Sequence, residues 1–89
     1  MRVVLTIIGQ DKVGIIAGVS NALAECNINI ININQNIMQG FFNMVLIGDM
    51  SEATVTLGEA KARLQALGEK IGVEIRIQSE EIFAAMHRV

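Results

Sequence analysis

Gly9-Gln10-Asp11-Lys12-Val13-Gly14-Ile15-Ile16 links an apolar run to an amphipathic one. The preceding run, residues 2–8, is rich in β-branched residues. Apolar residues recur at helical spacing after the second glycine: Ile15, Val19, Ala22, Leu23 and Cys26. The stretch therefore predicts a strand, a glycine-bounded loop and a helix. Such a loop leaves N–H groups free at a helix start, which favours an anionic ligand. A tight turn that merely needs two glycines would explain the same residues.

The rest of the chain supplies the elements of one small fold. We expect strand 2–9, helix 14–26, strand 28–38, strand 41–49, helix 57–71, strand 73–78 and a short helix 80–88. The second helix carries a capping box, Thr56 with Glu59, and the last helix can be capped by Ser79. The order βαββαβ predicts an α+β, ferredoxin-like sandwich whose antiparallel sheet has the order 4-1-3-2. Residues 1–78 form the expected domain and residues 79–89 a C-terminal helical extension.

Patterning along the strands predicts where each one lies. Residues 3–8 and 41–47 are apolar on nearly both faces, which is typical of a central pair, whereas residues 73–78 alternate as an edge strand does. Two helices can cover one face of that pair. The other face requires either another subunit or the apolar side of the last helix: Ile82, Phe83 and Met86.

Charge is distributed unevenly along the 89 residues, of which 52% are hydrophobic. Residues 1–48 hold four charged side chains: Arg2, Asp11, Lys12 and Glu25. A surface so poor in charge is typical of an interface. Strand 28–38 is an uncharged, amide-rich edge, although proteins usually protect such an edge with Lys or Glu. The sequence therefore predicts a homodimer, while amides tolerated on an exposed edge remain the simpler explanation.

Composition also argues against several locations and partners. Residues 26–48 carry no charge, but amides that a bilayer would penalise interrupt them: Asn27, Asn29, Asn32, Asn34, Gln35, Asn36, Gln39 and Asn43. We expect no membrane association and no signal peptide. The lone Cys26 allows no intramolecular disulfide and fits the cytoplasm. The net charge of −2 argues against direct contact with nucleic acid.

Catalytic and metal-binding patterns are weak in this sequence. Cys26 and His87 are the only soft metal ligands, too few for a zinc site, and His87 would have to serve any Ser-His or Cys-His catalysis from the end of the chain. The stretch 9–14 lacks the spacing of a dinucleotide fingerprint. We therefore predict a binding module rather than an enzyme, with no cofactor and no metal.

The glycine-bounded loop, followed by a helix and by Asn27-Ile28-Asn29-Ile30, resembles the ACT domain family over residues 1–78. The chain looks like the small members that consist of a single ACT domain, and it is also similar to the ACT domains of the glycine-cleavage transcriptional repressor. This resemblance implies a regulatory module that binds an amino acid or similar ligand between two copies. The family commonly has proline where this chain has Val13, which affects preorganisation of the helix start.

Residue by residue, the resemblance places a ligand site at the loop and at the second strand of a neighbouring copy. Asp11 matches a position that contacts a polar group of the ligand, and the backbone of Gly14 and Ile15 matches the point of close approach. The expected ligand-binding residues are Asp11, Lys12, Val13, Gly14, Ile15, Asn32 and Asn34. Helix N–H groups and Lys12 favour a carboxylate, while Asp11 and a strand amide can accept from an ammonium group.

Alternative explanations remain open for these residues. Asp11 can serve as an N-cap, and Lys12 can be a solvated loop charge. The function expected is that of a regulatory sensor. The alternative is a ligand-free interaction protein that docks on a metabolic enzyme or a transcription regulator.

Overall fold

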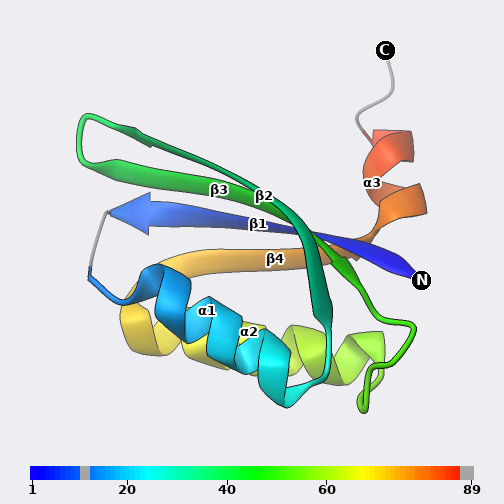
Figure 1. Cartoon of the computed structure of the whole chain (residues 1–89). Coiled ribbons are helices and arrows are strands. Elements are labelled where there is room, and N and C mark those ends of the chain that lie inside the picture. Colours follow the sequence, from blue (N-terminus) through cyan, green and yellow to red (C-terminus); the bar gives the residue numbers. More distant parts are fainter. Residues whose placement is uncertain (11–12, 87–89) are drawn as a thin grey trace.

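The computed structural model describes residues 1–10 and 13–86. Its elements follow the predicted order (Figure 1): β1 (Arg2–Gln10), α1 (Ile15–Glu25), β2 (Asn29–Met38), β3 (Phe41–Asp49), α2 (Leu57–Ile71), β4 (Val73–Ser79) and α3 (Glu80–Met86). Element boundaries lie within a residue or so of those predicted. The expected end of the last helix, with His87, lies outside the described residues.

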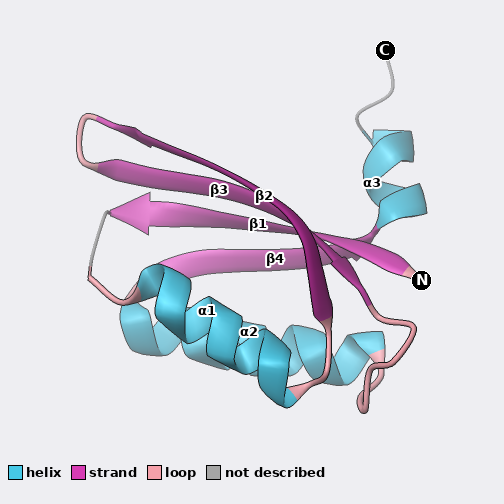
Figure 2. Ribbon diagram, in the orientation of Figure 1, coloured by secondary structure: helices cyan, strands magenta, loops and turns pink. Residues whose placement is uncertain are grey.

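The four strands form one antiparallel sheet in the order β2-β3-β1-β4, which is the predicted order counted from the other edge. Helices α1 and α2 cover one face of this sheet, so the fold is a two-layer α+β sandwich (Figure 2). The opposite face, which we call the open face, is in contact with α3 near its β1–β4 side. The predicted ferredoxin-like architecture is confirmed.

The core lies between the two helices and the sheet. Its largest fully buried side chains come from β1, α1 and β3: Leu5, Ile7, Ile15, Leu23, Met44, Leu46, Val3 and Val19. Burial of each large apolar side chain contributes about 1.5–3 kcal/mol to folding. Cys26 is 3% exposed and belongs to this cluster, which confirms its expected role as a small core residue.

Strand β2 contains a β-bulge that the sequence pattern did not reveal. Ile30 and Asn32 pair with the consecutive residues Gly48 and Ile47, so Ile31 is the extra residue. Side chains alternate between the two faces of a strand, and one inserted residue shifts that alternation. The bulge therefore keeps the later asparagines on the open face and the later isoleucines on the helix side.

Helix α2 begins with the predicted capping box and ends at a glycine C-cap. The Thr56 Oγ1 accepts from the N–H of Glu59 at 3.1 Å, and a Glu59 carboxylate oxygen accepts from the N–H of Thr56 at 3.0 Å. The Thr56 N–H holds the pKa of Glu59 below its ordinary value. At the other end Gly72 has a φ of 77°, the left-handed conformation expected after a helix.

Helix α3 packs on the open face against β1 and β4. Its first turn is capped as predicted, because the Ser79 Oγ accepts from the N–H of Ile82 at 3.2 Å. Phe83 is half-buried, whereas Ile82 and Met86 are 54% and 64% exposed. The helix therefore covers one part of the open face and leaves the remainder uncovered within one chain.

Candidate functional site

The glycines that bound the loop have different structural roles. Gly14 is the N-cap of α1 with a φ of 93°, and a Cβ built there would have open space around it. Gly9 lies in β1, and its φ is not positive. A Cβ on Gly9 would come within 2.8 Å of the Val73 Cγ1, so the close neighbour of its backbone is β4. Gly14 therefore has the left-handed conformation that glycine permits, whereas Gly9 allows a close approach between two strands.

Around the loop, backbone groups and side chains are available to different degrees. Gly14 is the N-cap residue of α1, and as a glycine it has no side chain that could cap the helix. The side chain of Ile15 is in the core, 2% exposed, so this residue offers a ligand its N–H rather than its side chain. Val13 is fully exposed. Asp11 and Lys12 lie outside the described residues.

The two candidate asparagines point away from α1. Asn32 pairs with Ile47 and Asn34 pairs with Val45, all on the open face. Together with Ile33 these four residues line a cavity of about 360 Å³. Because α1 lies on the other face of the sheet, one chain does not bring these amides to its own loop. A site that combined both would need a second chain.

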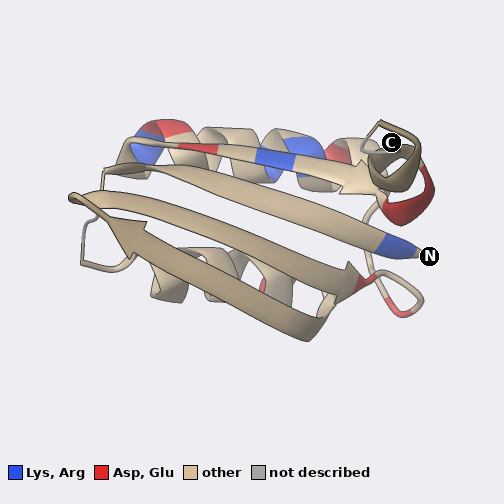
Figure 3. Ribbon diagram, turned by 90° about the horizontal axis from the view of Figure 1, so that it is seen from above, with Lys and Arg blue, Asp and Glu red and all other residues tan. Residues whose placement is uncertain are grey.

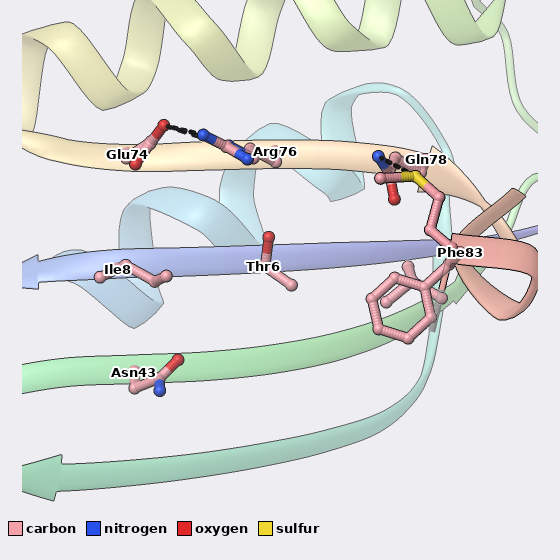
Figure 4. Close-up of a pocket in the computed structure, with 9 residues that line it drawn as sticks. Thr6, Ile8, Asn43, Glu74, Arg76, Gln78 and Phe83 are labelled. Carbon is pink, nitrogen blue, oxygen red and sulfur yellow. Dashed lines mark hydrogen bonds and ion pairs between the residues drawn. The ribbon is translucent and has the colours of Figure 1, made fainter. Parts of the chain in front are cut away.

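A second cavity, of about 370 Å³, lies between α3 and the open face of β1 and β4 (Figure 4). Its walls combine apolar and polar side chains: Val4, Thr6, Ile8, Asn43, Glu74, Arg76, Gln78, Phe83 and Met86. This cavity was not predicted from the sequence. One signal was available, since the polar residues of strand 73–78 alternate onto the same face as Val4, Thr6 and Ile8.

Charge in this cavity comes from one ion pair on β4. The Nε and Nη2 of Arg76 both donate to the Oε1 of Glu74, at 3.1 and 2.9 Å. Both side chains are largely exposed, 71% and 59% respectively. Farther along the strand, the Nε2 of Gln78 donates to the Sδ of Met86 at 3.4 Å and so links β4 to α3.

Charged side chains are scarce on the other half of the sheet. Strand β2 has none, and β3 has Asp49 alone, at its end (Figure 3). The side facing the helices also has exposed apolar groups, because Ile33 and Ile37 are 41% and 52% exposed although they pair with buried residues of β3. This half of the molecule has the composition of a surface that becomes covered.

Metal-ligating residues do not cluster in the described part of the chain: no group of three or more His, Cys, Asp or Glu could hold an ion there. The buried Cys26 has one polar neighbour across the helix layer, the Nη1 of Arg63 at 3.8 Å from its Sγ. No helix within residues 1–10 and 13–86 is long and apolar enough to cross a bilayer.

The family model of the ACT domain matches residues 1–78. The chain belongs to the ACT domain family. A protein designated UPF0237 from Listeria monocytogenes serotype 4b is 55% identical over the whole length of both chains. A solved ACT domain protein from Streptococcus pneumoniae superposes with a TM-score of 0.80 at 32% identity, over 100% of this chain and 96% of that one.

The fold is also similar to a putative glycine cleavage system transcriptional repressor, as the resemblance implied. The TM-score is 0.74 at 18% identity, over 86% of this chain and 44% of that one. This likeness concerns the fold alone. ACT domains are regulatory modules that bind small ligands, and this chain has the fold of one.

Proposed function

We propose that this ACT domain binds an amino acid or a similar small metabolite at the interface of a homodimer. It acts in the cytoplasm, regulates another protein and has no catalytic activity of its own. The exposed outer edge of β2 is the observation that supports this proposal most. The outer edge of β2 is unpaired in the described chain, carries no charge and has exposed isoleucines beside it.

A second copy can pair with this edge of β2. Pairing of two β2 strands would satisfy the free backbone groups and extend the sheet. The same contact would cover Ile33 and Ile37. The proposed site further requires Asn32 and Asn34 of one copy to approach the loop of the other, because within one chain they lie on the opposite face of the sheet from α1.

The start of α1 supplies the other half of the proposed site. Because the N-cap residue Gly14 has no side chain, it does not cap the first-turn N–H groups of α1. These groups attract a carboxylate. Lys12, two residues before Gly14 in the sequence, would add positive charge to this proposed site. Asp11 would accept from the ammonium group of the ligand, together with an amide of the second copy.

A thermal-shift screen of the purified protein against the amino acids tests this proposal, because binding to the native state alone raises the melting temperature. Asp11→Ala should weaken binding of any hit about ten- to a hundred-fold, since a hydrogen bond to a charged group is worth about 1.5–3 kcal/mol. Glu69→Ala, on the exposed side of α2, is the matched control. An absence of hits, or full affinity in Asp11→Ala, would contradict a site at this loop.

Gly14 is a poor position for such a test. A valine there would have open space around it, but its backbone would be held at a φ of 93°, which strains any β-branched residue. Loss of binding in Gly14→Val could therefore result from a distorted start of α1 as well as from a side chain that blocks the ligand. The side chains of Asp11, Asn32 and Asn34 are better probes. Asn32→Leu and Asn34→Leu should weaken the same ligand while the fold remains intact.

One observation favours the alternative function, a ligand-free interaction protein that docks on an enzyme or a transcription regulator. Met38 and Phe41 flank the β2–β3 turn and are 63% and 58% exposed. Large apolar groups at an exposed turn are suited to contact with another protein. Phe41→Ser would then abolish capture of a cytosolic partner while it leaves binding of amino acids unchanged.

A further inference from the structure

We propose that the cavity between α3 and the open face is a second ligand site, separate from the loop at residues 9–14. The ligand that fits is a small zwitterion with an aliphatic side chain. The cavity volume of about 370 Å³ falls within the usual range for small-molecule sites. The site lies on the opposite face of the sheet from α1, so it needs neither the loop nor a second copy.

The floor of the cavity is an apolar strip beside a charged one. In the antiparallel register Ile8 lies opposite Glu74, and Thr6 lies opposite Arg76. Ile8 is 49% exposed, an uncovered aliphatic group next to an exposed ion pair. A ligand with a charged end on β4 would therefore place its body over β1.

The ion pair keeps unused groups of both signs. Glu74 uses Oε1 to accept both bonds from Arg76, which leaves its Oε2 without a partner among the described residues. Arg76 uses Nε and Nη2, so its Nη1 hydrogens have no partner within residues 1–10 and 13–86. A carboxylate can bind at Nη1 and an ammonium group at Oε2 while the internal pair stays intact.

The two opposite charges of the ion pair favour a zwitterion over a ligand with a single charge. A carboxylate alone would meet the repulsion of Glu74, and an ammonium ion alone would meet that of Arg76. A molecule with both groups close together complements the pair. Asn43 and Thr6 line the same space and provide neutral hydrogen-bonding groups beside it.

Helix α3 forms the wall that gives the site its apolar selectivity. Phe83 and Met86 both line the cavity, and Phe83 lies on the side away from the ion pair (Figure 4). The contacts that hold this helix in place include the Ser79 cap, the Gln78–Met86 hydrogen bond, and an ion pair between Arg2 and Glu80 at 3.7 Å. An aliphatic side chain directed from the ion pair toward Phe83 would lie over the open-face side chains of β1.

Titration of the full-length protein with L-leucine, followed by amide chemical shifts, tests this site. Leucine should shift amides of β4 and α3, whereas glycine, 4-methylpentanoate and isopentylamine should each bind at least ten-fold more weakly. Arg76→Gln and Glu74→Gln should each weaken leucine at least ten-fold, and the control Glu69→Gln should not. Absence of shifts in β4 and α3 up to about 10 mM leucine would overturn the proposal.

Asp11→Ala separates this site from the loop. We expect the leucine-induced shifts in β4 and α3 to persist in Asp11→Ala, because the loop leads into α1, which covers the other face of the sheet. Loss of these shifts in Asp11→Ala would overturn the second site. Shifts confined to the loop would overturn it as well but leave the proposed function standing. Shifts confined to β4 and α3 would support the second site and show that leucine does not bind at the loop.

Discussion

Gly9 of β1 lies opposite Val73 of β4, and a Cβ on Gly9 would come within 2.8 Å of the Val73 Cγ1. The same Cβ would lie 3.2 Å from the Val73 Cα, so rotation of the valine side chain would not remove the contact. The glycine that precedes the loop therefore permits close packing between two strands. Any role in ligand binding would come in addition to this one.

Gly9→Ala should destabilise the protein by about 1–3 kcal/mol, the usual cost of overpacking a well-packed site. Gly18→Ala is the matched control, because a Cβ there meets Leu67 at an ordinary 3.7 Å within a helix. That control should leave stability unchanged or raise it by up to about 1 kcal/mol. Denaturant unfolding measures both. Equal stabilities for the two variants would contradict the packing role of Gly9.

Local signals in the sequence predicted most of the fold. Thr56 and Glu59 are three residues apart, and their capping box depends on nothing outside that turn. Asn27, which follows the C-cap Cys26 of α1, adopts a φ of 56°, a left-handed conformation common after a helix and tolerated by asparagine. Such features are set by neighbouring residues, so the sequence alone can reveal them.

Features that depend on pairing were missed. The bulge at Ile31 follows from the register between β2 and β3, which a pattern of alternating residues does not contain. The cavity beside Arg76 requires α3 to fold back over β1 and β4, and the sequence left open whether α3 or another subunit covers that face. The sequence of one chain also does not reveal the geometry of the proposed loop site, because half of that site would come from a second chain.

Ile37→Lys should convert the proposed dimer into a monomer. Ile37 is 52% exposed in one chain, so a lysine there costs the monomer little, whereas it would place a charge in the proposed contact between β2 strands. Ile82→Lys on α3 is the control, since Ile82 is 54% exposed and far from that edge in the order of the sheet. Light scattering after gel filtration should give about twice 9.7 kDa for the native chain and the control. A native mass of one chain at micromolar concentration would contradict the dimer.

Helix α3 should stabilise the fold through Phe83 more than through its other apolar residues. Phe83 is half-buried on the open face, while Ile82 and Met86 are mostly exposed. We expect Phe83→Ala to cost about 1.5–3 kcal/mol and Ile82→Ala to have little effect. Thermal unfolding of the two variants checks this difference. Similar losses in both would mean that Ile82 is also covered, as contact with another subunit would require.

The capping box of α2 should make stability depend on pH through Glu59. The Thr56 N–H, and next its hydroxyl, hold the pKa of Glu59 below its ordinary value of about 4.3. The unfolded chain therefore binds more protons near that pH, and the contribution of Glu59 is present above it and lost as the pH falls below it. Glu59→Gln keeps a hydrogen-bonding side chain at this position without the charge. The stability difference between the native chain and Glu59→Gln should shrink as the pH falls below about 4.3.

Thr56→Ala distinguishes the charge of Glu59 from the cap itself. It removes the hydroxyl, at a cost of about 1 kcal/mol at neutral pH, but leaves the N–H that lowers the pKa of Glu59 most. Its pH profile should therefore run roughly parallel to that of the native chain, whereas the profile of Glu59→Gln should converge with it in acid. Melting temperatures measured from pH 7 to pH 3 separate the two patterns. A Glu59→Gln profile parallel to the native one would show that folding does not stabilise the ionised carboxylate.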